Sequence, residues 1–140
     1  MTASIQKRIL VDMSATLIHH GHIRLLKYAA SYGGVIVALT TDDEILKKKG
    51  YRPELSFLQR KEIIESFIMV TEVIPSPWLI TEEFLDLHLI DLLVHGEDNS
   101  NQISSDKLVV VPRTKDISSS ILREKSCRIL QEIDLFNKEV

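Results

Sequence analysis

The chain has 140 residues, of which 44% are hydrophobic and 26% are charged, the usual balance of a soluble globular protein. This length fits one compact domain, and we expect residues 1–140 to form a single unit. The net charge of −3 at pH 7 provides no global positive field that would recruit nucleic acid or an anionic membrane.

Five short apolar runs predict five β-strands. The first, RILVDM at residues 8–13, is nearly continuous in hydrophobic residues, as a strand buried on both faces is expected to be. The other four runs are residues 35–41, 71–75, 90–96 and 107–112. None of them approaches the ~18 apolar residues that a membrane-spanning helix needs.

Helical spacing of apolar residues predicts helices between the strands. Ile23, Leu26 and Ala30 predict a helix after the first strand, ending near residues 33–34, where two glycines follow one another. The charged segment 42–55 contains a glycine and a proline, so we expect it to be at best partly helical.

Capping residues indicate where the later helices begin. Ser56 and Gln59 form a capping-box pattern that opens a helix over residues 56–69. Thr81 is placed to cap a further helix with acidic residues in its first turn. The last helix is predicted to begin near residues 117–122. Its apolar residues, which we expect to face inward, are Leu122, Ile129, Leu130, Ile133 and Phe136.

Alternating strands and helices predict a single Rossmann-like, doubly wound α/β domain with a five-stranded parallel sheet. In such sheets ligands bind at the carboxyl ends of the strands, where the strand order reverses. Polar segments follow four of the predicted strands, at residues 19–22, 40–43, 95–99 and 113–120. We therefore expect these segments to contribute to a binding site.

Residues 19–22 read HHGH and are the first of these polar segments. His19 and His22 share one face if both lie in a helical turn, and Gly21 allows a ligand to approach the backbone. The free N–H groups of a helix N-terminus suit phosphate, and imidazoles can donate hydrogen bonds to oxygens that gain charge. A solvent-exposed loop is an equally good interpretation from position alone. A zinc site is weaker, because Cys127 and His88 are predicted to lie in other helices.

The compartment is inferred from cysteine usage and from the N-terminus. The single cysteine cannot form an internal disulfide. Residues 1–13 contain neither the apolar length nor the cleavage site of an export signal. We therefore expect a cytoplasmic protein in a reducing environment.

Several segments together resemble the cytidylyltransferase family of nucleotidyltransferases, most closely its glycerol-3-phosphate cytidylyltransferases and the related domains of phosphonate and polysaccharide pathways. The resemblance extends from about Ile9 to Arg123. Its segments are IHHGHIRLLKYAASYG, KKKGYRPELSFLQRKEIIES, EVIPS, VHGEDN and VPRTKDISSSILR. Two signatures are specific as a pair, H-x-G-H after the first strand and R-T-x-x-I-S-[ST]-[ST] after the fifth.

The resemblance implies transfer of CMP from CTP to a small phosphorylated or phosphonate acceptor, with release of pyrophosphate. His19, His22 and Arg113 match the family's catalytic positions and would contact the phosphates. His20 occupies a variable position and is interpreted as a bystander. Mg²⁺ is expected to accompany the triphosphate, with no dedicated protein ligands.

Further site residues are carried over from the family by position. The expected nucleotide-binding residues are Met13, Ser14, Ala15, Gly21, Gly96, Glu97, Asp98, Ser118, Ser119 and Ser120. The expected phosphate or acceptor contacts are Lys47, Lys49, Arg60 and Trp78. Structural alternatives stay open for several of these: a solvated lysine loop, a surface salt bridge for the arginine, packing of the tryptophan against prolines, and helix capping by a serine.

The sequence departs from the family pattern at several positions. The usual G-T-F-D before the histidines is replaced by residues 13–16, so Thr16 supplies no charge where aspartate is common. Asp116 stands where glycine is usual. Ile68, Met69 and Thr71 replace a more polar pattern near a subunit interface of relatives, and we still expect a homodimer. Two alternatives remain: an adenylyltransferase that uses ATP, or a nucleotide-binding module that has lost transfer activity.

Overall fold

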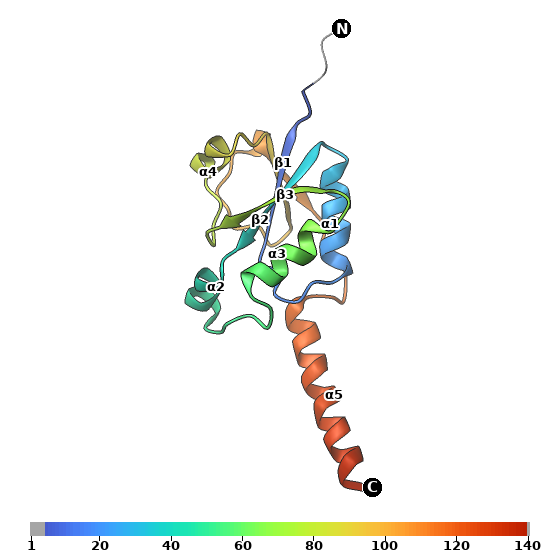
Figure 1. Cartoon of the computed structure of the whole chain (residues 1–140). Coiled ribbons are helices and arrows are strands. Elements are labelled where there is room, and N and C mark those ends of the chain that lie inside the picture. The colour runs from blue at the N-terminus through green and yellow to red at the C-terminus, as the bar shows by residue number, and fades with distance from the viewer. Residues whose placement is uncertain (1–4, 140) are drawn as a thin grey trace.

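In the part of the chain that the structure describes, five parallel strands form one sheet in the order β3-β2-β1-β4-β5 (Figure 1). The strands are β1 (Arg8–Met13), β2 (Gly34–Thr40), β3 (Val70–Ser76), β4 (Leu92–Gly96) and β5 (Leu108–Val111). From β1 the chain builds the sheet outward to β3, then returns to the other side of β1 to add β4 and β5. The strand order therefore reverses beside β1, and the predicted Rossmann-like α/β fold is confirmed.

The computed structural model describes residues 5–139. Residues 1–4, which belong to the stretch where we expect no export signal, lie outside the described part, as does Val140. Among the described residues, no helix is both long enough and apolar enough to cross a membrane.

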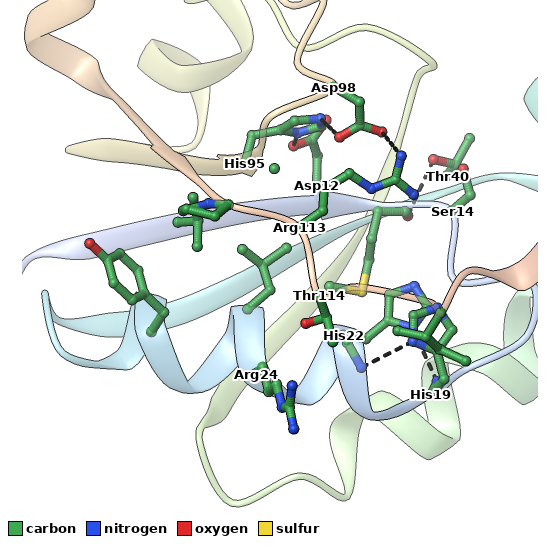
Figure 2. Close-up of a pocket in the computed structure, with 18 of the residues that line it drawn as sticks. Asp12, Ser14, His19, His22, Arg24, Thr40, His95, Asp98, Arg113 and Thr114 are labelled. Atoms are coloured by element: carbon green, nitrogen blue, oxygen red, sulfur yellow. Dashed lines mark hydrogen bonds and ion pairs between the residues drawn. The ribbon is translucent and has the colours of Figure 1, made fainter.

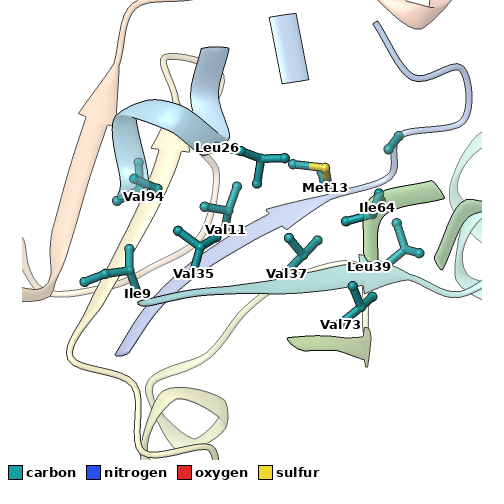
Figure 3. Packing of buried hydrophobic residues seen from close by; sticks show 12 residues of the cluster. Ile9, Val11, Met13, Leu26, Val35, Val37, Leu39, Ile64, Val73 and Val94 are labelled. Carbon is teal, nitrogen blue, oxygen red and sulfur yellow. The ribbon is translucent and has the colours of Figure 1, made fainter. Parts of the chain in front are cut away.

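The strand in the middle of the sheet is buried on both faces, as its sequence predicts. Alternate residues of β1 enter two separate apolar clusters. Ile9 and Val11 pack with Leu26 of the first helix on one face (Figure 3), and Leu10 packs with Leu85 on the other face. Both faces are covered, so the apolar residues in the middle of β1 are buried, and its one acidic residue, Asp12, lies near its carboxyl end.

Within residues 5–139, five α-helices connect or follow the strands, and one 3₁₀ turn precedes β5. The α-helices are α1 (His20–Ala30), α2 (Asp42–Lys49), α3 (Phe57–Glu65), α4 (Glu82–Leu87) and α5 (Ser119–Glu139). Ser56 caps α3 in a capping box with Gln59, and Thr81 caps α4, as predicted. Residues 42–49 form a complete helix, ended by Gly50 in the left-handed conformation, whereas we expected only partial helicity there.

The prediction that α5 turns its apolar side inward is wrong. No residue of this helix is buried, and Leu130 and Phe136 are each 66% exposed. Figure 1 shows α5 extending away from the sheet, so its outer turns have nothing to pack against. Contacts with the rest of the domain lie near its start, where Ser119 exchanges hydrogen bonds with the backbone of Leu17 and Arg123 pairs with Glu54.

Candidate active site

A cavity of about 950 Å³ opens at the carboxyl ends of β1 and β4, where the strand order reverses. Its walls come from the ends of β1 and β4, the first turns of α1, Trp78 and the segment after β5. The structure thus brings His19, His22 and Arg113 to the same opening (Figure 2), although the two segments lie more than 90 positions apart in the chain. This is where a doubly wound sheet is expected to bind a ligand.

The two motif histidines fix each other at the N-terminus of α1. His19 is the N-cap residue, and its Nδ1 accepts a hydrogen bond from the backbone N–H of Gly21 at 3.0 Å. The Nδ1 of His22 accepts from the backbone N–H of His19 at 3.2 Å. The pair forms a reciprocal capping box built from imidazoles, and the ring centroids lie 4.0 Å apart. Because His19 caps the helix, α1 begins at His20, three residues earlier than predicted.

These hydrogen bonds decide which ring nitrogen carries the proton. An Nδ1 that accepts a backbone N–H is unprotonated, so the neutral ring holds its hydrogen on Nε2. Burial, with a smaller effect of the neighbouring His19, lowers the pKa of His22 to about 4. Burial also lowers the pKa of His19, helped by the charges of His20 and Arg113. Both rings are therefore neutral near pH 7, with Nε2–H as a donor for a ligand.

Gly21 provides the space in which the ring of His19 reaches its capping position. A Cβ at residue 21 would lie 2.8 Å from Cε1 and 2.9 Å from Nδ1 of His19. Either distance is shorter than van der Waals contact allows, so a side chain there would displace the ring. This role differs from the predicted one, which was to admit a ligand close to the backbone.

Cationic side chains line the same cavity as the two rings. Arg113, Arg24, Lys115 and Lys49 all line the cavity, and Lys49 lies over the ring of Trp78 with its Nζ 5.6 Å from the centroid. Lys47, also expected at the site, is not among the lining residues. This end of the cavity combines a helix N-terminus, neutral imidazole donors and positive charge, which suits phosphate groups.

A second polar group lines the opposite side of the cavity, formed by Asp12, His95, Asp98 and Asn101. The Nδ1 of His95 is hydrogen-bonded to a carboxylate oxygen of Asp12, whose other oxygen accepts from the Asn101 amide at 3.1 Å. Asp98 lies 3.8 Å from Nε2 of His95 and 4.0 Å from the Arg113 guanidinium (Figure 2).

These neighbours change the pKa of His95. Burial opposes a charged ring, but the hydrogen bond that the ring makes to Asp12 and the negative charges of Asp12 and Asp98 outweigh it and raise the pKa of His95. Of the two carboxylates, Asp12 is nearly buried, with 10% of its side chain exposed, whereas 60% of Asp98 is exposed. This acidic side therefore contrasts with the cationic side at α1.

Arg60 is not at the site, and its expected contact with phosphate or acceptor is wrong. The side chain is fully buried beneath the loops that follow β1 and β2. Its guanidinium donates to the backbone oxygens of Ser14, Thr40 and Leu55 and forms an ion pair of 2.7 Å with Asp42. Every branch of the guanidinium is engaged, so Arg60 holds the loops that carry the cavity wall.

The serines after β5 are structural in this conformation. Ser118 accepts a hydrogen bond from the backbone N–H of Ile121 and caps α5, and the hydroxyl of Ser119 is paired with the backbone of Leu17. Neither these two nor Ser120 lines the cavity.

The remaining expected site residues divide into two groups. Met13, Ser14, Gly21, Gly96, Asp98 and Trp78 line the cavity. Ala15 and Glu97 do not line it, although Glu97 accepts a hydrogen bond from the backbone N–H of Arg113 at 2.8 Å and so holds that residue in place. His20, interpreted as a bystander, also lies in the wall.

The sequence did not single out Asp12, His95, Asn101, Arg24 or Lys115 as site residues, although His95 and Lys115 lie in polar segments that were expected to contribute. A signal existed for the first two, because each is the last residue but one of an otherwise largely apolar strand, and the carboxyl ends of parallel strands meet at one edge of a sheet. No comparable signal marks Arg24, which looks like an ordinary surface residue of α1 until the cavity is seen.

Fold and cavity together define a class, an α/β protein with a ligand-sized cavity at the switch point of its sheet. The sequence identifies the group within that class. Residues 14–125 match the family described as Cytidylyltransferase-like, and the chain belongs to that family. It is accordingly a nucleotidyltransferase.

Curated relatives support the same family. The chain is 32% identical over 124 residues to the glycerol-3-phosphate cytidylyltransferase of Bacillus subtilis, covering 85% of this chain and 96% of the relative. It is 37% identical over 93 residues to the ethanolamine-phosphate cytidylyltransferase of Mus musculus, covering 65% of this chain and only 23% of that protein. It is 28% identical over 144 residues to the FAD synthase of Thermococcus sibiricus, covering 95% of this chain and 96% of the relative.

A solved structure supports the fold. The lipopolysaccharide core biosynthesis protein from Thermoplasma volcanium GSS1 superposes with a TM-score of 0.66, covering 79% of this chain and 99% of that one. At 17% sequence identity this similarity concerns the fold alone.

Proposed function

We propose that the protein transfers CMP from CTP to a small phosphorylated acceptor and releases pyrophosphate. The observation that carries the proposal is the meeting of two Nε2–H donors, His19 and His22, with the guanidinium of Arg113 at one cavity. These donors are already oriented by the capping box, so they do not have to reorganise when charge develops on the phosphates.

The proposed reaction is an in-line displacement at the α-phosphorus of CTP. An oxygen of the acceptor's phosphate or phosphonate forms the new P–O bond, and the bond to the β-phosphate oxygen breaks, so pyrophosphate leaves with that electron pair. His19, His22 and Arg113 donate hydrogen bonds to the oxygens that gain charge, and Lys49 lies where it can neutralise the leaving group.

Mg²⁺ is proposed to enter with the triphosphate. Within residues 5–139, no cluster of three or more histidine, cysteine, aspartate or glutamate side chains could hold a metal ion. Phosphate oxygens are therefore its proposed principal ligands.

The acidic side of the cavity indicates which chemical groups the acceptor carries. Asp12 and Asp98 present carboxylates near His95, and such groups accept hydrogen bonds from hydroxyl or ammonium groups. We propose an acceptor whose phosphate or phosphonate faces α1 and whose other end carries such a donor. Glycerol-3-phosphate and ethanolamine phosphate, which appear in the names of relatives, both have this form.

A homodimer remains our proposal for the assembly, and the cytoplasm our proposal for the location. Ile68, just beyond α3, is 99% exposed, as expected for an apolar residue at a subunit contact. The free thiol of Cys127 is exposed, which suits a reducing compartment.

Use of ATP is the second candidate, because one relative that spans the whole domain is an FAD synthase, whose product contains an adenine nucleotide. The phosphate-binding groups do not distinguish the two bases. The experiment measures pyrophosphate release with each nucleoside triphosphate, Mg²⁺, and an acceptor panel of glycerol-3-phosphate, ethanolamine phosphate, choline phosphate and 2-aminoethylphosphonate.

Release with CTP and one of these acceptors supports the proposal, and release with ATP alone supports the second candidate. Binding of CTP without release across the panel would show that transfer activity has been lost. The matched control is Lys138→Gln, an exposed residue at the far end of α5, which should turn over at the wild-type rate.

A further inference from the structure

The apolar stripe of α5 has no partner in the described chain. It consists of Leu122, Ile129, Ile133 and Phe136, and the small polar Ser126 completes their row at intervals of four, three, four and three residues. Leu130, which is 66% exposed, flanks the row. Ile129 is 44% exposed, Ile133 49% and Phe136 66%. A single turn of isolated surface residues would need no explanation, but this stripe runs through most of a 21-residue helix.

The spacing identifies what kind of surface the stripe fits. Alternating steps of three and four residues average 3.5, which is the repeat of helices that pack side by side in a coiled coil. Helices that pack on a globular domain instead present a broader stripe with a period of 3.6. Figure 1 shows that α5 extends beyond the sheet, so the stripe is accessible to another helix along its length.

We propose that α5 pairs with α5 of a second copy of this chain in an antiparallel two-stranded coiled coil. The proposal is independent of the enzyme's substrate and of any contact near α3. It assigns to α5 the role of joining two catalytic domains at opposite ends of a short helical rod.

Side-chain sizes favour the antiparallel orientation. In this alignment Ile129 faces the partner's Ile133, and the small Ser126 faces the partner's Phe136, a large side chain, so these layers are filled. In a parallel pair Phe136 would face its own copy while Ser126 would face another serine, which crowds one layer and leaves a gap in another.

Helix length selects the register. Centring the pair near residue 131 places the partner's Glu139 beside Arg123, so the paired segments end where the domain begins. A shift by one further heptad toward the domain would force the partner's helix end against residue 116, which lies in the loop before α5. The centred alignment is therefore the longest one that avoids the body of the partner.

Flanking charges agree with the same alignment. Lys125 faces the partner's Glu139 at both ends of the rod, and Leu130 faces its own copy at the centre, which extends the apolar contact. Glu132 meets its own copy across the two-fold axis, the one unfavourable pair in this register. A parallel pair would place Lys125 beside Leu130 and Glu132 beside Asn137, with no ion pair at either position.

A lipid surface is a poorer partner for α5. Its polar residues comprise four cationic and four acidic side chains: Arg123, Lys125, Arg128 and Lys138 against Glu124, Glu132, Asp134 and Glu139. Helices that lie on anionic membranes have a polar face rich in lysine and arginine. The balanced charge of α5 lacks that attraction.

The test is the mass of the full-length chain as a function of concentration, measured by sedimentation equilibrium. We expect Ile133→Glu to raise the dissociation constant at least about 100-fold, because a carboxylate would be buried in a central layer of the pair. Leu135→Glu is the matched control, since Leu135 lies on the outer side of the helix and is already 61% exposed. The mass of the Ile133→Glu variant shows which assembly forms without the α5 contact. Comparing the wild type with this variant therefore isolates the α5 contact, whether or not another interface also joins copies.

Two further variants test the orientation. Glu132→Gln should tighten association about two- to fivefold by removing the like-charge pair. Lys125→Glu should weaken it by a similar factor, and Lys125→Glu combined with Glu139→Lys should restore it. Loss of association in Leu135→Glu as well, an unchanged dissociation constant in Ile133→Glu, or no rescue by the double exchange would overturn the proposal. So would a wild type that never doubles its mass yet binds phosphatidylglycerol vesicles.

Discussion

At the scale of single residues, each motif histidine can cap α1 with one ring nitrogen and donate a hydrogen bond with the other. His19 and His22 accept hydrogen bonds from backbone N–H groups with Nδ1, and this leaves Nε2–H available to donate to a ligand. The pattern of residues predicted that both would share one face, but it did not reveal the capping box. Serine, threonine, aspartate and asparagine are the usual N-caps, so nothing in the sequence alone assigns that role to an imidazole.

The capping box changes what a substitution at His22 is expected to do. From sequence alone, His22→Ala should reduce turnover with little effect on stability. The structure predicts that it also removes a cap and lowers the free energy of unfolding by about 1 kcal/mol. His22→Gln should keep most of that stability, because a glutamine at this position can accept the same backbone hydrogen bond.

Both variants should lose more than about 100-fold in kcat. Alanine has no donor, and a glutamine amide held through its oxygen by the capping hydrogen bond does not reproduce the position of the imidazole N–H. The measurements are pyrophosphate release and urea unfolding of the wild type and the two variants. Wild-type activity in His22→Gln would remove the proposed role of the ring. Equal stability of all three proteins would remove the capping role.

The low pKa of His22 makes stability depend on pH in a defined direction. The folded state holds this pKa near 4, below the ordinary value of 6.5 that applies after unfolding. The unfolded chain therefore binds the proton first, so the contribution of His22 is intact above pH 6.5 and is lost as the pH falls toward 4.

Between pH 7 and pH 5 the wild type should lose about 1–2 kcal/mol of stability that His22→Gln does not lose. The check is urea unfolding of the two proteins at both pH values. Parallel losses in the wild type and the variant would show that this ring is not held neutral by the fold.

At the scale of elements, the five strands and four of the helices could be predicted because their apolar residues repeat with the period of the structure they form. The observed ends of elements differ from the predicted ones where a cap or a turn sets them, as at the start of α1. The apolar side of α5 was also predictable, but its direction was not. Periodicity shows that a helix has an apolar face and not which surface that face will meet, and in α5 Ile129 and Phe136 remain exposed.

Arg60 is the clearest case in which a side chain serves the elements around it. A basic residue after a loop rich in lysine looks like a phosphate ligand in sequence, and only burial and the four partners of its guanidinium show otherwise. Since Arg60 joins the loops after β1 and β2 to Asp42, its removal takes the donor from three buried or partly buried backbone oxygens and from one oxygen of the Asp42 carboxylate.

We expect Arg60→Ala to lower the free energy of unfolding by about 3 kcal/mol or more. Lys61→Ala is the control, because Lys61 is a surface residue whose ion pair with Glu65 contributes little. Urea unfolding measures both. If the Arg60→Ala protein is as stable as the control but binds CTP more weakly, Arg60 contacts the ligand and is not a structural residue.

At the scale of the whole molecule, the topology converts separate sequence motifs into one site. The strand order places the ends of β1 and β4 side by side, which brings the HHGH turn, the His95 segment and the Arg113 segment to one cavity. The cationic part of this cavity followed from two signatures read together. The acidic part, Asp12 with His95, needed the strand order, because it depends on which strands are neighbours.

The central claim is that this cavity binds the triphosphate of CTP between α1 and the segment after β5. A crystal structure of the protein with CTP and Mg²⁺ tests it most directly. We predict phosphate oxygens within ~3 Å of Nε2 of His19 and His22 and of the Arg113 guanidinium. A triphosphate bound elsewhere on the molecule, with all three groups unliganded, would contradict the account.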